Sequence, residues 1–428
     1  MRLAYLSPLP PKRSGIATYS AHLLPELASH FDVVPMDFGA PIADPAAVDL
    51  RENASARADL PSFPARLYHL GNNPHYHLEI YRTLRDAPGV VVLHDTVLYY
   101  LMAGQGLGGL ILECCDNEGP AGVSLALAIR DAAPEHDVLR YATPERYPLL
   151  QGVLRHAQGI VVHNHTARRQ LEAAFYKGPV AVIPLLSYPV DAALADPALI
   201  ESRKRAIGLH PDELHIGCFG FIGRTKRIEQ IVRALEIAAP RLPKWRLVIV
   251  GEGEAPEDLL RESPISDRIV RLGFVNETEW GRYLGAVDLV LNLRHPSMGE
   301  TSLSLMEAME YGNACIVTND AWFSELPDAA VVKIPYDHTE VSELAAQLAR
   351  LAADPAARMR LGEQARAYCD TQCRPERAAT LYAEFIRQVA SANRGGSQSM
   401  AARDQRSPAN WLETYAIDRV RARIKLPA

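Results

Sequence analysis

The sequence is short of the features that define several protein classes. It has six cysteines, none in a CxxC pair or a His-rich metal spacing, so disulfides and zinc ligands are not expected. Its amino-terminal apolar run is too short for a secretion signal or a membrane span. The formal net charge of -6 gives no global reason to bind nucleic acid or anionic lipid, so any anion site must be local. These absences predict a cytoplasmic protein with reduced cysteines.

What the sequence does contain is a regular alternation of short apolar runs and longer segments with helical period. With 428 residues and 48% hydrophobic content, the chain is long enough to bury two cores. The alternation predicts α/β domains with parallel strands covered by helices. The predicted strands are residues 2–6, 31–36, 65–70, 90–94, 159–163 and 180–183, then 215–219, 246–250, 269–272, 287–291, 314–317 and 330–334.

The connection between the two series lies at residues 191–211, which are rich in Ala, Asp, Arg and Pro and have no strand pattern. We place the boundary near residue 208, which gives two doubly wound domains. Ligands of this architecture bind outside the carboxyl ends of the strands, so we expect the site in a cleft between the domains.

Two turns in the second half are suited to phosphate. Arg224, Lys226 and Arg227 precede the predicted helix 228–238, where positive charges oppose the helix dipole unless an anion joins them. A solvated charge cluster is the alternative interpretation. The small-residue turn Gly299–Thr301 opens a helix that carries Glu307, and backbone N–H groups at a helix start also bind phosphate. Together the two turns predict a site for a nucleotide diphosphate.

The first half offers weaker candidates. Gly15 starts a helix, where it allows close approach of a ligand or merely serves the turn. His94 and Asp95 end a strand, where site residues accumulate, although a structural histidine is the alternative. Residues 104–109 match GxGxxG but begin too far after their strand, so we discount NAD. We expect a mobile segment over residues 104–122 that contacts an acceptor or a membrane.

The motifs also occur in a particular order. They are Pro10-Pro11 through Ser14-Gly15-Ile16, Tyr68 to Asn72 with Pro88 to Asp95, Phe219-Gly220 to Lys226-Arg227, Gly273-Phe274-Val275 ahead of Tyr283 and Asp288, and Gly299 to Ser302 with Glu307-Ala308-Met309 and Gly312. In this order they resemble the family 4 glycosyltransferases, over roughly residues 1–390. The resemblance implies a GT-B fold, with two Rossmann-like domains facing across a cleft. It also implies sugar transfer from a UDP- or GDP-linked donor with retention of the anomeric configuration.

The resemblance assigns roles to the matched residues. The implied catalytic residues are Lys226 on the diphosphate, Glu300 facing the donor sugar and His94 on the cleft wall. The implied donor-binding residues are Gly15 beside the sugar, Arg224 and Arg227 as basic neighbours of the lysine, Gly273, Phe274 and Val275 at the base edge, Thr301 and Ser302 at the phosphate, and Glu307 at the ribose.

No cofactor or metal is implied. The departing diphosphate is stabilised by cations and a helix start, and in the family the leaving phosphate is thought to receive the acceptor proton. The absence of a DxD-type acidic cluster at a strand end agrees with this cationic arrangement.

The chain departs from the family pattern at two places. Six residues separate Glu300 from Glu307, where family members usually have seven, which alters the turn that faces the donor sugar. Many members carry an arginine five residues before the lysine, where this chain has Phe221. Arg224 or Arg227 is the expected substitute.

The resemblance also divides the chain. Residues 1–207 form the acceptor-side domain, 208–374 the donor domain, and 375–390 a helix crossing back to the first domain. Residues 391–428 read as a flexible linker and a basic amphipathic tail helix, suited to peripheral membrane contact, to docking on its own domain or to self-association.

The expected partners are a nucleotide sugar and an acceptor that is a glycan, a lipid-linked glycan or a small molecule, and not nucleic acid. A non-catalytic nucleotide-sugar-binding or assembly subunit with the same fold is the main alternative. Sugar-nucleotide epimerisation or glycoside phosphorolysis on that fold is a further one.

Overall fold

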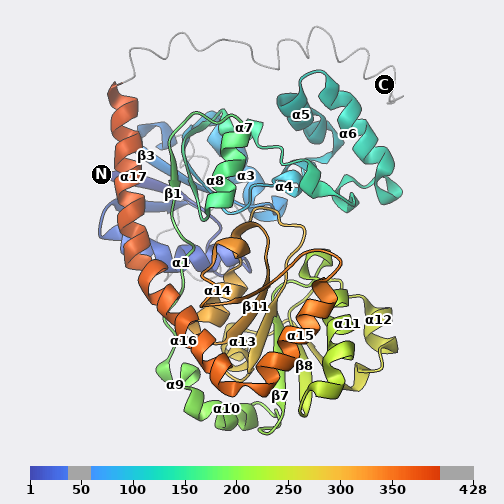
Figure 1. The fold of residues 1–428 in the computed structure, drawn as a ribbon. Coiled ribbons are helices and arrows are strands. Elements are labelled where there is room, and N and C mark those ends of the chain that lie inside the picture. Colours follow the sequence, from blue (N-terminus) through green and yellow to red (C-terminus); the bar gives the residue numbers. More distant parts are fainter. Residues whose placement is uncertain (37–58, 396–428) are drawn as a thin grey trace.

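The computed structural model describes residues 1–36 and 59–395, which form two α/β domains, one above the other in Figure 1. Each domain contains a six-stranded sheet in which every pairing is parallel. The first sheet consists of β1 (Arg2–Leu6), β2 (Asp32–Met36), β3 (Ala65–Leu70), β4 (Gly89–Leu93), β5 (Ala157–Val162) and β6 (Val180–Val182). The second consists of β7 (Leu214–Phe219), β8 (Trp245–Val250), β9 (Ile269–Gly273), β10 (Leu289–Asn292), β11 (Ala314–Thr318) and β12 (Val332–Ile334). The predicted strands and the predicted fold class are confirmed.

The strand order shows where each domain binds ligands. The first sheet has the order β2-β1-β3-β4-β5-β6 and the second β12-β11-β10-β7-β8-β9. In such sheets the binding crevice lies where the order reverses, outside the carboxyl ends of the strands. In the second sheet this switch point lies between the hydrogen-bonded neighbours β7 and β10. The loops after β7 and after β10 are therefore the places to look for a ligand site.

Helices cover both faces of the sheets. In the first domain they are α1 (Gly15–Ala28), α3 (Pro74–Asp86), α4 (Tyr99–Ala103), α5 (Gly106–Glu118), α6 (Ala121–Ala132), α7 (Gln151–Leu154) and α8 (His165–Ala173). The remainder are α9 (Ala192–Ala195), α10 (Ile200–Ala206), α11 (Ile228–Ala238), α12 (Glu257–Glu262), α13 (Glu277–Leu284), α14 (Leu303–Glu310), α15 (Glu340–Ala353), α16 (Pro355–Gln372) and α17 (Pro375–Gly395). The predicted helix 228–238 is confirmed as α11. Its buried Ile228, Ile231, Val232 and Leu235 follow the spacing of one helical face, and that face packs on the core.

Helix α17 joins the two domains. It leaves the second domain after α16 and runs along the first domain beside α1 (Figure 1). The Tyr382 hydroxyl is hydrogen-bonded to the Tyr19 hydroxyl of α1 at 2.8 Å. A Cβ on Gly159 would lie only 2.8 Å from Val389 Cγ2, so the glycine lets α17 approach β5. The helix continues to Gly395, so residues 391–395 of the linker and tail predicted over 391–428 belong to α17, and the remainder of that prediction lies outside the described residues.

One prediction for the first domain is wrong. Residues 104–122 are not a mobile glycine-rich loop, because most of them belong to α5 and the start of α6, which pack against each other. Leu110, Ile111, Cys114 and Cys115 are buried on α5. These spaced apolar residues drive helix formation through packing, which outweighs the weak helix propensity of the glycines.

The six cysteines are free and buried, which confirms that they are packing residues. Across residues 1–36 and 59–395, no helix combines the length and apolarity that a bilayer crossing demands. The same residues contain no cluster of three or more His, Cys, Asp or Glu side chains arranged to hold a metal ion.

Candidate active site

A cavity of about 720 Å³ lies between the two domains at the carboxyl ends of the strands. Four of the predicted site residues line it, namely Gly15, His94, Glu300 and Thr301. Gly15 lies close to the other domain, since a Cβ on it would be 3.3 Å from Leu303 Cδ2 at the start of α14. The structure therefore brings the amino-terminal end of α1 from the first domain and that of α14 from the second to the same cavity.

Lys226 occupies the switch point of the second sheet. It ends the short 3-10 turn Arg224–Lys226 after β7, is 1% exposed, and its Nζ donates a hydrogen bond to the Phe219 carbonyl at 2.6 Å. A Cβ on Gly220 would lie 3.2 Å from Lys226 Nζ and 3.4 Å from Ser304 Oγ, so the ammonium and the first turn of α14 flank the same space. Burial, together with the charge of Arg294, lowers the pKa of Lys226 to about 7.

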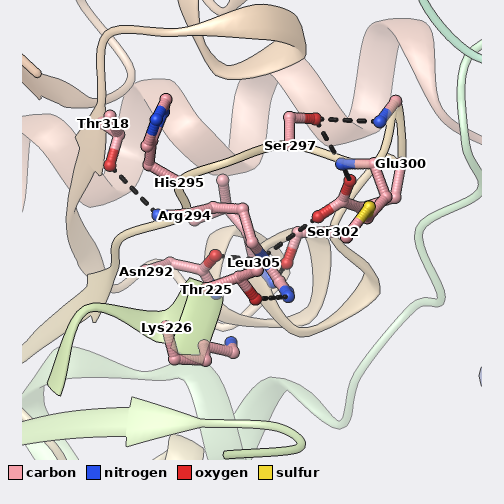
Figure 2. Close-up of polar contacts among 12 residues, drawn as sticks. Thr225, Lys226, Asn292, Arg294, His295, Ser297, Glu300, Ser302, Leu305 and Thr318 are labelled. Carbon is pink, nitrogen blue, oxygen red and sulfur yellow. Dashed lines mark hydrogen bonds and ion pairs between the residues drawn. The ribbon is translucent and has the colours of Figure 1, made fainter. Parts of the chain in front are cut away.

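Arg294 is the second cation of this region, and our sequence reasoning missed it. It follows β10, and its Nε lies 3.2 Å from Glu300 Oε1 in an ion pair (Figure 2). Its Nη1 donates to Thr225 Oγ1 at 3.2 Å, and its backbone N–H donates to Thr318 Oγ1 at 3.0 Å. The guanidinium is thereby fixed next to the residue that precedes Lys226. The signal that would have found it is a charged residue at the carboxyl end of a strand, the same signal that selected His94.

Glu300 lies near the end of the loop that leads from Arg294 to α14. Its Oε2 accepts hydrogen bonds from Met298 N at 2.6 Å and Ser297 Oγ at 3.1 Å, while Oε1 faces Arg294 (Figure 2). The Glu300 carboxylate is therefore engaged within its own loop and with the arginine.

The same loop touches the first domain. The Met298 carbonyl accepts hydrogen bonds from the N–H groups of Thr96 at 3.0 Å and Val97 at 2.9 Å. Gly299 has a φ of +78°, and a Cβ there would lie 1.6 Å from Thr96 Oγ1, so glycine is required both for conformation and for space.

The start of α14 is held from both sides. The Ser302 side chain caps the helix by accepting from Leu305 N at 3.3 Å, and its hydroxyl donates to Asn292 Oδ1 at the end of β10. The Thr301 hydroxyl accepts from Asn164 Nδ2 of the first domain at 3.1 Å. The helix start is thus fixed at the interdomain cavity, which Thr301 and Leu303 line.

The two arginines that flank Lys226 are engaged elsewhere. Arg227 forms a two-point ion pair with Glu340 of α15, its Nε donating at 3.0 Å. Arg224 is 56% exposed and reaches across the cleft rim to Glu145 at 3.1 Å. Both arginines therefore have carboxylate partners away from the Lys226 ammonium.

His94 belongs to a buried chain of three histidines. Its Nε2 lies 3.0 Å from His69 Nδ1, and its Nδ1 lies 3.2 Å from His163 Nε2. The far nitrogen of His163, Nδ1, lies 2.9 Å from the Ile183 carbonyl and must therefore carry the proton. In neutral rings that proton sets the order along the chain: His94 donates to His163, and His69 donates to His94.

Burial keeps these histidines neutral, since it lowers the pKa of His163 to about 4 and that of His94 well below its ordinary value. His94 thus lies in the cavity wall with both ring nitrogens occupied. Asp95, the next residue, also lines the cavity and accepts from Asn72 N at 2.8 Å. Burial and the neighbouring Glu300 raise the pKa of Asp95 to about 7.

The residues predicted to bind the nucleoside lie farther along the second domain. Glu307 on α14 accepts a hydrogen bond from Trp280 Nε1 at 3.0 Å, and burial raises the pKa of its carboxyl group to about 7. Gly273 ends β9 with a φ of +64°. The Phe274 ring is half exposed, and the Arg13 guanidinium of the first domain lies 4.4 Å above it. Val275 packs at the edge of the core.

The chain has recognisable relatives. Residues 200–368 match the family model of glycosyl transferases group 1. The lipopolysaccharide core biosynthesis mannosyltransferase LpsB of Rhizobium meliloti is 32% identical over 134 residues, which cover 29% of this chain and 36% of that protein. The matched segment thus spans little more than a third of the length of this curated relative.

Solved structures resemble the chain over almost its whole length. Sucrose-phosphate synthase from Thermosynechococcus elongatus has a TM-score of 0.61 at 18% identity, covering 91% of this chain and 99% of that one. HepE of Anabaena, in complex with UDP, has a TM-score of 0.63 at 15% identity, covering 91% and 100%. At these identities the likeness concerns the fold. Together with the two parallel sheets, it shows that the chain has the GT-B fold of glycosyltransferases.

Proposed function

We propose that this protein is a glycosyltransferase that moves a sugar from a nucleoside diphosphate sugar to an acceptor hydroxyl, with retention of the anomeric configuration. The observation that carries the proposal is the buried Lys226 ammonium, which shares one space with the first turn of α14 at the switch point of the second sheet. A buried cation beside a helix start is a site for a polyanion. A diphosphate of a nucleotide has the charge and the length to contact both.

The comparisons support this assignment. The match to glycosyl transferases group 1 covers residues 200–368, which contain Lys226, Glu300 and Glu307. The relative LpsB is a mannosyltransferase, and the HepE structure contains UDP. We therefore propose a UDP- or GDP-linked donor of the kind used by family 4 enzymes, handled in the cytoplasm.

The chemistry follows from where negative charge develops. As the bond between the anomeric carbon and the phosphate breaks, the diphosphate gains charge, and preorganised donors there are each worth about 3 kcal/mol. Lys226 and the N–H groups at Thr301 and Ser302 supply such donors. We propose that they do so without a metal ion, and that the departing phosphate accepts the proton of the attacking hydroxyl.

The remaining residues orient the donor. In this proposal the Glu307 carboxylate accepts a hydrogen bond from a ribose hydroxyl. Its Oε2 also accepts a hydrogen bond from Trp280 Nε1. The backbone of Gly273 to Val275 reads the base edge. Gly15, His94 and Asp95 form the first-domain wall beside the sugar, and the rest of that cavity receives a glycan, lipid-linked or small-molecule acceptor.

A donor panel tests the proposal. The purified full-length protein is incubated with UDP-, GDP- and ADP-sugars and candidate saccharide acceptors, and the release of nucleoside diphosphate is measured. We expect release from one nucleotide class, with a product whose anomeric configuration by NMR equals that of the donor. Inversion would contradict the retaining mechanism. Tight donor binding without release across the panel would favour a non-catalytic nucleotide-sugar-binding or assembly subunit.

A further inference from the structure

The position of Arg294 follows from the topology of the second sheet. Strands β7 and β10 are hydrogen-bonded neighbours although 69 residues separate the end of β7 from the start of β10. Lys226 comes shortly after the end of β7, and Arg294 comes two residues after the end of β10. The two cations are thus delivered to the same crevice by the two strands that flank the switch point.

The contacts of Arg294 place its guanidinium beside the turn Arg224–Lys226, the proposed anion site that we call the Lys226 pocket. Its Nη1 is hydrogen-bonded to the side chain of Thr225, the residue next to Lys226 (Figure 2). The positive charge of Arg294 helps to lower the pKa of Lys226, so each cation lies within the electrostatic reach of the other. Two like charges held together in a mostly buried place are costly unless a compensating anion is present. Glu300 supplies one negative charge, and a diphosphate would supply at least two.

The other arginines nearby do not meet this description. Arg227 is committed to Glu340 on α15, and Arg224 extends along the exposed rim to Glu145. The position five residues before the lysine holds Phe221, which is 74% exposed and carries no charge. Arg294 keeps 19% of its side chain exposed and has only Glu300 as its ion-pair partner among the residues that the structure describes.

We propose that Arg294 is the second cation that grips the donor diphosphate, replacing the basic residue absent at Phe221, and that Glu300 acts on the diphosphate by holding the Arg294 guanidinium in place. The inference rests on the proposed function of the Lys226 pocket. It changes the role of Glu300, whose carboxylate contacts Arg294 and its own loop and so positions a cation. The fork of the guanidinium suits a phosphate oxygen better than an ammonium would.

The test measures binding of inorganic pyrophosphate by isothermal titration calorimetry, in the presence of EDTA, to the full-length protein. Pyrophosphate reports on the cations without requiring the sugar or the base to be known. The variants are Arg294→Gln, Arg294→Lys, Glu300→Gln and Lys226→Gln. The control for net charge is Arg233→Gln, since Arg233 is an exposed residue of α11 that pairs with Glu229.

We expect Arg294→Gln to bind pyrophosphate at least about tenfold more weakly than the wild type, as for loss of a charge-assisted hydrogen bond. Arg294→Lys should fall between the two, and Arg233→Gln should stay within about twofold. Glu300→Gln should weaken pyrophosphate binding by less than Arg294→Gln does, because the arginine keeps its charge and loses only the ion pair that holds it in place.

The opposite outcomes overturn the inference. Arg294→Gln within twofold of the wild type would show that Arg294 does not bind the diphosphate. Equal weakening by Glu300→Gln and Arg294→Gln would show that the arginine only holds the loop. If Arg294→Gln does not fold, Arg294→Lys decides the question. Pyrophosphate binding by Arg294→Lys with wild-type affinity and an unchanged salt dependence of that affinity overturns the inference. Binding that is several-fold weaker than that of the wild type supports it.

Failure of the proposed function looks different. In that case the wild type does not bind pyrophosphate, or Lys226→Gln binds it as well as the wild type, and the inference falls with the pocket. Weakening by Lys226→Gln alone would leave the proposed function standing and remove only Arg294 from it.

Discussion

The two walls of the cleft use ionisable side chains in opposite ways. On the second-domain side, Lys226 and Arg294 follow the neighbouring strands β7 and β10, and Arg294 forms an ion pair with the Glu300 carboxylate. On the first-domain side, His94 lines the cavity, is kept neutral by burial, and is hydrogen-bonded through both ring nitrogens to His69 and His163. The second-domain side therefore carries basic groups that a bound anion can engage, whereas the cavity-lining His94 already has a hydrogen-bond partner at each ring nitrogen. The difference indicates that the second domain supplies binding energy for the diphosphate, while the first shapes the space around the sugar.

The largest expected effect comes from removing the buried ammonium. Lys226→Met should lower turnover by a factor of about 10²–10³, the range for loss of one preorganised donor. The free protein should unfold at a temperature no lower than the wild type, because a buried, partly charged group is replaced by an apolar one of similar length. Steady-state kinetics and differential scanning calorimetry measure the two quantities. Lys244→Met, at an exposed position, is the matched control and should change neither.

Retained turnover in Lys226→Met would break the comparison, since the charged wall would then not contribute to the reaction. A marked drop in the melting temperature would instead show that the ammonium is needed for the fold through its hydrogen bond to the Phe219 carbonyl.

A second effect follows from the pKa of Lys226. The folded free protein holds this pKa at about 7, below the ordinary value of 10.5, so the lysine is mostly neutral above pH 7. A bound diphosphate favours the charged form and raises the pKa, so binding takes up a proton. The affinity for UDP or GDP should therefore fall between pH 7.5 and 9, by at most about tenfold per pH unit.

Calorimetry in two buffers of different ionisation enthalpy measures that proton uptake. Lys226→Arg provides the control, because an arginine stays charged over the whole range and its binding should be flat with pH. An affinity of the wild type that does not change with pH would contradict a neutral lysine in the free protein.

The smallest expected effect on the diphosphate concerns the histidine chain. His163→Phe leaves the Ile183 carbonyl and the His94 Nδ1 hydrogen without partners in the interior. Such losses cost about 1–3 kcal/mol for each group, so the melting temperature should fall by several degrees. Pyrophosphate affinity should stay within about twofold of the wild type. Chemical denaturation measures the stability of this variant, and isothermal titration calorimetry measures its affinity for pyrophosphate. A loss of affinity with unchanged stability would mean that the first-domain wall also binds the diphosphate.

The comparison also explains what the sequence could reveal. The strands were predictable because most of them are short, mainly apolar runs, as is typical of parallel strands buried on both faces. Lys226 was identifiable because three cations at one helix start conflict with the helix dipole. Arg294 could have been selected as a charged residue just after a strand, but its relation to Lys226 exists only once β10 lies beside β7.

The histidine chain was hidden for the same reason. His69, His94 and His163 end three consecutive neighbouring strands of the first sheet and meet only through the strand order. The helical structure of residues 104–122 was missed because their glycines were given more weight than their spaced apolar residues. The roles of the individual site residues remain proposals.

The backbone of Met298 has a mechanical consequence. Its carbonyl is bonded to two amides of the opposite domain, and its own N–H is bonded to Glu300, which in turn pairs with Arg294. Any movement that separates the domains would strain the hydrogen bonds from Thr96 and Val97 to the Met298 carbonyl. Arg294 lies only four residues before Met298, so the strain would also reach its guanidinium. Release of the nucleoside diphosphate product would then be coupled to domain opening, because opening would weaken the contacts of Arg294 with the diphosphate.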